Sequence, residues 1–405
     1  MAKQIIDTPS HDITEYDLLP RHISRDNKPE TIDLSAPLRR YTRGNEEHEY
    51  RIQVAILPAV MQCTSGTPDN IASNLAMYNF SGVAGPVNCT QPKERQLAVV
   101  RRLKESGARI IPAAINTHDY EERVPALVKA GANLIIVDTS QGFSDYQKET
   151  IDFTKGGYPY LPVVGGNIAT PDGFVFLADK CKADVAKVGY GVGAGCITGD
   201  VLGVARRQGT AIRKVAEARD DFYKTTDTYV PIIADGGIKT FSDIPKAYAL
   251  GADIVMVGRL IAGADETPNP LFTVRFLRNG NVAYEGLAKE FWYEASDRAR
   301  LLAQGPIRDY SYRYEEGKEG WVKGVGPLTE FLSMGFVKIR DAIRKAGYRS
   351  IPDMHENAEL ELANRAVDSN DPDIAIWDHK DVKVLIEDEW MPSGELQKYM
   401  MERRN

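Results

Sequence analysis

The chain lacks the features that would point to a membrane, a secretory route or a nucleic acid. No apolar run approaches the roughly 18 residues that a membrane span requires. The first residues, MAKQIIDTPSHDITEYDLLP, contain acids and no long apolar core, so they do not have the pattern of a signal peptide. The formal net charge is −7 and the pI is about 5.6, so no overall basic character favours a nucleic-acid partner.

Cysteine and histidine are also scarce. The four cysteines, at positions 63, 89, 181 and 196, show no CxxC spacing, so neither a disulfide framework nor a zinc ribbon is indicated. This cysteine usage fits a reducing compartment, and we expect a cytoplasmic protein. The six histidines form no HxxxH pair, which argues against a His-rich metal site.

What the chain does contain is a series of short β-rich apolar runs separated by amphipathic helical stretches. Continuous Val, Ile and Ala runs are typical of parallel strands buried on both faces. Eight alternating units over about 200 residues predict an α/β fold, a (β/α)8 TIM barrel. A doubly wound sheet is the alternative, disfavoured because no GxGxxG follows the first strand. The expected strands span 54–60, 82–87, 109–115, 133–138, 161–167, 184–189, 230–236 and 253–258.

The pattern changes after the last expected strand. Residues 262–325 contain no clear barrel helix and are rich in Arg, Tyr and Glu, so we expect a flap beside the site. A helix is expected again over 327–347, as the eighth barrel helix. We therefore expect 1–385 to form a single catalytic barrel domain that includes the flap, and 386–405 to form a partly ordered C-terminal tail.

The most informative segment is DVAKVGYGVGAGCIT, residues 184–198. An apolar strand leads into a loop with four alternating glycines, followed by Cys196 and, two residues later, Thr198. Glycines are needed where a backbone adopts unusual dihedral angles or approaches a ligand closely. A thiol on such a loop is a candidate nucleophile, and a small buried thiol in a tight turn is the alternative.

Polar and glycine-rich positions follow several of the expected strands, where a TIM barrel places its chemistry. Glycines after the last three strands suit a phosphate site, because backbone N–H groups can close on phosphate oxygens. For Asp235–Gly236–Gly237 alone, an ordinary turn is the alternative. The positions concerned are Met61, Asp138, Asn167, the loop 189–198, Asp235–Gly236–Gly237 and Gly258–Arg259.

Several motifs in one order resemble the IMP dehydrogenase and GMP reductase family of barrel oxidoreductases. TEYDLLP (14–20) is similar to the family's TYDDVLLLP, and the cysteine loop is similar to GIGPGSICTTR. DTSQGFS (138–144), GGNIAT (165–170), IADGGI (233–238) and GADIVMVG (251–258) also resemble family motifs. The connection over 102–108 has no room for the CBS modules of many family members, so the chain resembles the compact members. The resemblance further implies a homotetramer or larger assembly.

The resemblance implies a purine-nucleotide substrate and a nicotinamide cofactor, either NADP or NAD. In the family a cysteine attacks C2 of the purine and forms a covalent thioimidate, which separates the redox step from the hydrolytic or aminolytic step. By resemblance Cys196 is this nucleophile, and Thr198 handles the water or ammonia. Substrate-binding positions would be Met61, Gly195, Asp235, Gly237, Gly258, Arg259, Tyr293 and Ser296. Cofactor-binding positions would be Asp138, Ser140, Asn167 and Gly189. Gly191, Gly193 and Cys196 match the family's K⁺-binding loop, and the alternative is that no ion binds here.

The chain also departs from the family pattern. The serine two residues before the cysteine is Ala194 here, and the arginine of the TTR motif is replaced by Gly199. Arg259 follows Gly258 where the family has Ser or Gly, and it could replace a lost phosphate contact or be a surface charge. The base-reading G-M-[GS]-S aligns with 294–297, which reads EASD.

The flap sequence bears on the direction of the reaction. Glu316 lies 19 positions after Asp297, and this spacing and the segment YRYEEGK (312–318) resemble the reductases, which makes Glu316 the candidate acid. Arg313–Tyr314 reads as the dehydrogenase dyad, although the spacing differs. The leading prediction is therefore a GMP reductase, and the alternatives are an IMP dehydrogenase or a related reaction on a modified purine nucleotide. A catalytically inactive nucleotide-binding protein and a flavin-dependent barrel enzyme are further alternatives, and the presence of Cys196 argues against the first.

Overall fold

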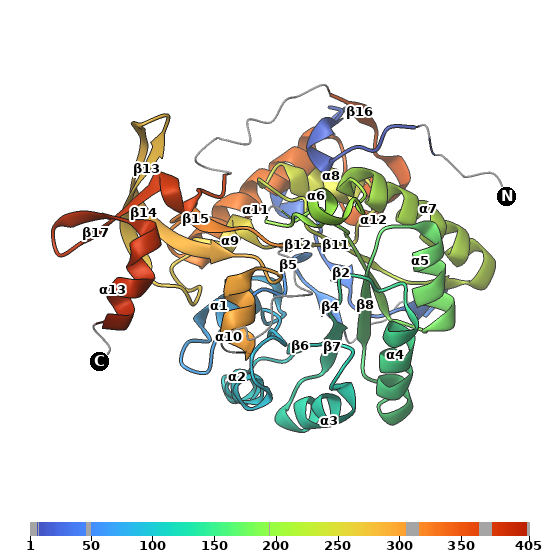
Figure 1. Cartoon of the computed structure of the whole chain (residues 1–405). Coiled ribbons are helices and arrows are strands. Elements are labelled where there is room, and N and C mark those ends of the chain that lie inside the picture. The colour runs from blue at the N-terminus through green and yellow to red at the C-terminus, as the bar shows by residue number, and fades with distance from the viewer. Residues whose placement is uncertain are drawn as a thin grey trace.

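A seven-stranded parallel sheet forms the centre of the computed structural model, with helices around it (Figure 1). The structure describes residues 6, 8–45, 50–193, 195–304, 316–363 and 375–402. The strands neighbour one another in the order β5-β12-β11-β9-β8-β7-β6. The first of these strands in the chain, β5, therefore lies beside the last, β12, as in a closing barrel. The strands are β5 (Ile56–Pro58), β6 (Pro112–Ile115), β7 (Leu134–Val137), β8 (Val163–Ile168), β9 (Val185–Val188), β11 (Ile232–Asp235) and β12 (Ile254–Val257).

The eighth expected strand, 82–87, is present as an extended segment rather than a regular strand. Ala84 N donates to Ile110 O at 2.9 Å, and Val87 forms a parallel bridge with Ala113, so the segment lies beside β6. It contains Gly85 and Pro86, and proline cannot donate to a ladder. This segment fills the gap between β5 and β6, and the prediction of a TIM barrel is confirmed.

The barrel strands are buried almost throughout, which explains their continuous apolar sequence. The helices pack on the outside, and three begin at side-chain caps: Ser144 accepts from Gln147 N, Thr170 from Gly173 N and Ser350 from Asp353 N. The outer helices are α1 (Ala72–Ser81), α2 (Lys93–Glu105), α3 (Tyr120–Ala130), α4 (Asp145–Gly157), α5 (Pro171–Val175), α7 (Gln208–Thr226), α8 (Asp243–Ala249), the expected eighth helix α11 (Leu328–Lys345) and α12 (Ile351–Asn357). Two short helices, α6 (Thr198–Leu202) and α9 (Arg259–Ala262), follow β9 and β12.

A five-stranded antiparallel sheet lies beside the barrel, at the left of Figure 1. Its order is β15 (Glu319–Lys323), β14 (Asn281–Trp292), β13 (Leu271–Arg278), β17 (Val382–Ile386) and β18 (Glu389–Pro392). The structure therefore differs from the expected flap and partly ordered tail, because both segments contribute strands to one sheet. Helices α10 (Asp297–Gln304) and α13 (Leu396–Glu402) accompany it.

The sheet has its own hydrophobic core, which explains why the two segments fold together. Trp321 and Trp377 are buried with Phe276, and the rings of Phe276 and Trp377 stack with centroids 4.9 Å apart. Backbone hydrogen bonds of 2.8 Å join Trp321 and Trp377 in both directions. This core draws its residues from 274–288, 321, 377–384 and 396, so no short stretch of sequence contains it.

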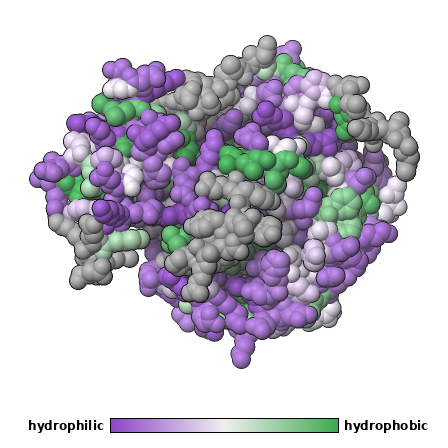
Figure 2. All heavy atoms as spheres, viewed as in Figure 1, coloured by the Kyte–Doolittle hydropathy of each residue, from purple (hydrophilic) through white to green (hydrophobic). Residues whose placement is uncertain are grey.

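Smaller antiparallel pairs lie at the periphery. They join β1 (Tyr16–Leu18) to β16 (Leu360–Leu362), β2 (Ala36–Pro37) to β4 (Arg51–Ile52), and β3 (Tyr41–Thr42) to β10 (Thr228–Tyr229). The visible face is mostly hydrophilic, with separate hydrophobic patches (Figure 2). In the described part of the chain, no helix combines the length and apolar character that crossing a bilayer requires.

Candidate active site

A cavity of about 530 Å³ lies where the barrel strands end. Its walls come from the segments that follow β5, β7, β8, β9, β11 and β12, together with the residues at the end of β14. The structure brings most of the predicted site residues to this one cavity. Those that line it are Met61, Asp138, Ser140, Asn167, Gly189, Gly191, Gly193, Gly195, Asp235, Gly237, Gly258, Arg259 and Tyr293.

Other predicted residues do not line the cavity. Ser296 is buried, and its hydroxyl accepts from Ala299 N of α10, so its role in substrate binding stays a prediction. Cys196, Thr198 and Glu316 form a separate group that begins next to the cavity-lining Gly195. Arg313 and Tyr314 lie outside the described residues, so the dyad stays a prediction.

The loop after β9 is held close to its neighbours at its glycines. Gly191 has φ +71°, in the left-handed region that glycine adopts without strain. A side chain at Gly193 would come within 3.0 Å of the Tyr293 ring, and one at Gly195 within 3.2 Å of Tyr293 and Phe291. The glycines at 193 and 195 therefore allow the loop to pack against the end of β14.

Cys196 begins a chain of three polar side chains. Its Sγ lies 3.1 Å from Thr198 Oγ1, and the Thr198 hydroxyl donates to Glu316 Oε2 at 2.7 Å. Backbone bonds fix this arrangement: Ile197 N donates to Glu316 O at 2.9 Å, and Lys318 N donates to Gly195 O at 2.7 Å. The segment at 316–318 is thus attached directly to the cysteine loop.

Cys196 differs from the other three cysteines in its surroundings. It is half-buried, whereas Cys63, Cys89 and Cys181 are buried. Burial raises the pKa of the Cys63 and Cys181 thiols to about 12, which suits inert core thiols. Burial, and then the neighbouring Cys196, raise the pKa of Tyr293, so this phenol stays protonated beside the loop.

The cavity wall carries two carboxylates that share one lysine. Lys187 Nζ lies 2.7 Å from Asp138 Oδ1 and 3.0 Å from Asp235 Oδ2. Asn167 Nδ2 donates to Asp235 Oδ2 at 3.1 Å and to Gly189 O at 2.8 Å. Sequence reasoning selected the two aspartates and Asn167 but missed Lys187, whose signal was a single lysine within the apolar strand VAKV.

One end of the cavity has the composition of an anion site. Gly236 and Gly237 have φ +93° and +81°, and Gly258 precedes α9. Arg259 is buried rather than a surface charge, and it donates to Lys239 O at 2.5 Å. Burial lowers the pKa of Arg259 to about 10, so the guanidinium remains a cation at neutral pH.

Another part of the cavity wall carries a half-buried acid, Glu294, which the family motifs marked only as a departure. Glu294 accepts hydrogen bonds from Gln62 N and, at 3.2 Å, from Thr90 Oγ1. Burial raises the pKa of Glu294 to about 7. Because Glu294 lines the cavity, its protonation state changes the charge of this wall near neutral pH.

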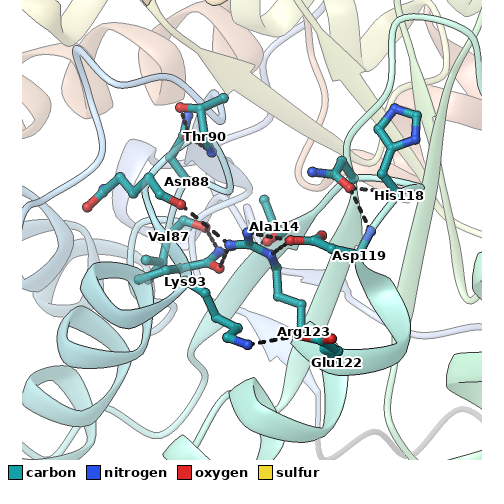
Figure 3. A network of polar contacts seen from close by, with 12 residues as sticks. Val87, Asn88, Thr90, Lys93, Ala114, His118, Asp119, Glu122 and Arg123 are labelled. Carbon is teal, nitrogen blue, oxygen red and sulfur yellow. Dashed lines mark hydrogen bonds and ion pairs between the residues drawn. The ribbon is translucent and has the colours of Figure 1, made fainter. Parts of the chain in front are cut away.

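Beside this wall lies an arginine that sequence reasoning missed. Arg123 is buried and lines the cavity, with Nε donating to Asp119 Oδ2 at 2.7 Å and Nη1 to Gln96 Oε1 at 2.8 Å (Figure 3). The only local signal was an Asp and Arg four residues apart at the start of α3. These partners fix the guanidinium at the edge of the cavity.

The family model for the IMP dehydrogenase / GMP reductase domain matches residues 13–370. The chain belongs to the IMP dehydrogenase / GMP reductase family. This confirms the resemblance drawn from the motifs. The short connection between α2 and β6, residues 106–111, agrees with the expected compact form of the family's barrel.

Relatives of this family member are named as dehydrogenases. It is 36% identical over 257 residues to the inosine-5'-monophosphate dehydrogenase of Tritrichomonas foetus, covering 63% of this chain and 49% of that protein. The corresponding enzyme of Chlorobaculum tepidum is 38% identical over 242 residues, which cover 59% of this chain and 47% of that protein. The enzyme of Nitrosopumilus maritimus is 32% identical over 268 residues, which cover 65% of this chain and 53% of that protein. The chain spans about half the length of these relatives. Their names favour the alternative prediction of a dehydrogenase over the leading prediction of a reductase.

The K⁺ loop expected from the family motif stays a prediction. The Gly193 carbonyl accepts from Cys196 N at 2.9 Å, so part of its acceptor capacity is already used. Among the described residues, no cluster of three or more His, Cys, Asp or Glu side chains could hold a metal ion.

Proposed function

We propose that this protein oxidises a purine nucleotide at C2, converting IMP, NAD and water to XMP, NADH and a proton. The observation that carries the proposal is the chain Cys196–Thr198–Glu316, placed directly after a cavity-lining glycine. It joins a thiol to a hydroxyl and a carboxylate, which are the groups needed for covalent attachment followed by hydrolysis.

The cavity is suited to hold the nucleotide by its phosphate and sugar. The N–H groups near Gly237 and Gly258 and the buried Arg259 cation provide donors for a phosphate. The Asp235 carboxylate provides an acceptor for ribose hydroxyls. These contacts would place the purine between Met61 and Tyr293, which line the same cavity.

The residues present also fit a nicotinamide cofactor. Asn167 Oδ1 is buried and has no hydrogen-bond partner among the described residues, so it can accept from the carboxamide of the cofactor. Asp138 can accept from the cofactor's ribose. When bound, the nicotinamide ring supplies the acceptor for the hydrogen and two electrons that leave C2 of the purine.

Catalysis then proceeds in two stages on the purine. The Cys196 thiol adds to C2 and forms a C–S bond, and loss of the C2 hydrogen with its electron pair, together with one proton, leaves a thioimidate. Water then attacks C2, its proton passes through the Thr198 hydroxyl to Glu316, and the C–S bond breaks as the thiol is restored. Cys196 follows the cavity-lining Gly195, and its side chain contacts the cavity-lining Tyr293, so the thiol lies at the edge of the cavity.

An absorbance assay of the full chain at the reduced-nicotinamide band tests the proposal. We expect NADH to accumulate with IMP and NAD, and no oxidation of NADPH with GMP. Oxidation of NADPH with GMP alone would overturn the direction. If the protein turns over neither IMP with NAD nor GMP with NADPH, the proposed substrate is wrong. A modified purine nucleotide as substrate and a catalytically inactive nucleotide-binding protein would then remain as alternatives.

A GMP reductase is the second candidate, because the group of Cys196, Thr198 and Glu316 that carries the first proposal also suits this reaction. The contact of Glu316 with Thr198 at 2.7 Å brings an acid to the hydroxyl beside the thiol, as release of ammonia requires. The GMP and NADPH arm of the same assay decides between the two directions. The homotetramer, the K⁺ ion and the cytoplasmic location remain proposals, and sedimentation of the full chain would test the first.

A further inference from the structure

Lys187 lies behind the cavity, between the two aspartates that face it. The lysine side chain is 1% exposed, whereas the side chains of Asp138 and Asp235 are 26% and 19% exposed. Both aspartates line the cavity and the lysine does not. Asp138 follows β7 and Asp235 ends β11, so the ammonium on β9 joins two segments that are far apart in sequence.

A buried lysine at this position is energetically unfavourable by itself, and the neighbouring strand leaves space for it. Burying a charge is unfavourable unless it is paired, and an apolar residue would suit this strand position better. Gly166 of β8 leaves the space open, since a side chain there would come within 2.7 Å of Lys187 Cβ. Burial lowers the pKa of Lys187, but the two carboxylates raise it further, to above its ordinary value. The ammonium therefore remains charged.

The hydrogen bonds leave one oxygen of each carboxylate for a ligand. Lys187 and Asn167 both donate to Oδ2 of Asp235, and Lys187 donates to Oδ1 of Asp138. In the part of the chain that the structure describes, no protein donor contacts Asp235 Oδ1 or Asp138 Oδ2. Each aspartate can therefore accept a hydroxyl while it keeps its bond to the lysine.

We propose that Lys187 is a positioning residue that couples the two nucleotide-binding halves of the cavity. The inference rests on the proposed function, in which Asp235 binds the substrate ribose and Asp138 the cofactor ribose. One ammonium is shared by two acceptors, so a loss of charge at one moves the ammonium toward the other. An aspartate that is paired more closely with Lys187 is a weaker acceptor for a ligand hydroxyl, and each half thus responds to the other.

Binding of IMP to full-length Cys196→Ala protein, measured by calorimetry, tests the coupling without turnover. We expect Asp138→Asn to raise the dissociation constant of IMP by about 5-fold, although Asp138 belongs to the other half. In a Lys187→Met background, Asp138→Asn should change the constant much less, because no shared ammonium is left to move toward Asp235. Lys187→Met alone should weaken the binding of both IMP and NAD.

Lys289→Met is the matched control. Lys289 is equally buried, but it donates to Asp265 O and to Thr267 outside the cavity, so its loss should not alter the effect of Asp138→Asn. If Asp138→Asn does not change IMP binding with Lys187 present, the inference is wrong even if Lys187→Met fails to fold. An equal effect with and without Lys187 would also overturn it. If neither IMP, GMP nor XMP binds, the proposed function fails together with the inference, whereas binding without coupling removes the inference alone.

Discussion

Replacing Glu294 by glutamine should stabilise the protein, and increasingly so as the pH rises. Burial raises the pKa of Glu294 from 4.5 to about 7 in the folded state, so folding favours the neutral acid. Stability from this group is fully present below pH 4.5 and is lost as the pH rises to about 7. Glutamine has nearly the same shape and no charge to bury, so it avoids this loss.

The magnitude follows from the size of the pKa change. The difference between 4.5 and about 7 corresponds to about 3 kcal/mol of stability lost at high pH. Most of it, about 2 to 3 kcal/mol, falls between pH 5 and pH 8. The Asp138 carboxylate opposes ionisation of Glu294 further, whereas the bonds from Gln62 and Thr90 favour it. Glutamine can accept from Gln62 N and donate to Thr90 Oγ1, so the fold should tolerate the change.

Urea unfolding of both proteins at pH 5, 6, 7 and 8, at one protein concentration, measures the effect. The advantage of Glu294→Gln over the parent chain should grow across this range. Glu285→Gln is the control, because Glu285 lies on β14, the strand that ends just before Glu294, but is exposed and paired with Arg275. A stability difference between Glu294→Gln and the parent that stays constant from pH 5 to pH 8 would refute the reasoning.

Three further predictions concern the thiol, the acid and the core. Cys196→Ala should abolish turnover while IMP still binds, as measured by absorbance and calorimetry; normal turnover would exclude the covalent route. Glu316→Gln should slow steady-state turnover at least about 10²-fold yet retain one equivalent of NADH in the first turnover, because only the water step loses its base; loss of this burst would place Glu316 elsewhere. Gly335→Ala should lower stability by about 1 to 3 kcal/mol, since a methyl group would overlap the Phe241 ring; an unchanged melting temperature would contradict the packing.

The sequence predicted the barrel well because its signal is local. Each buried parallel strand reads as a continuous apolar run, and the glycines of the phosphate end follow their strands directly. The run at 82–87 shows the limit, since Gly85 and Pro86 let it lie in the barrel wall without forming a full ladder.

The second sheet and part of the site could not be predicted in this way. The pairing of Trp321 with Trp377 depends on two segments that are not adjacent in the chain, and neither segment shows a strong pattern by itself. Lys187 and Glu294 became visible as site residues only once the fold had brought charged partners and a cavity wall to them. Sequence also could not show that the Cys196 side chain lies against Thr198 at the edge of the cavity.

The strand β14 connects the sheet that holds the C-terminal strands to a wall of the cavity. It pairs with β13 and β15 in the outer sheet, and the residues directly after it, Tyr293 and Glu294, form a wall of the cavity. β17 pairs with β13, and β13 pairs with β14. A partner that binds the edge of this sheet and displaces β17 or β18 would therefore shift β14 and the cavity wall that follows it. The rate of the reaction would then respond to events at the outer sheet that never touch a nucleotide.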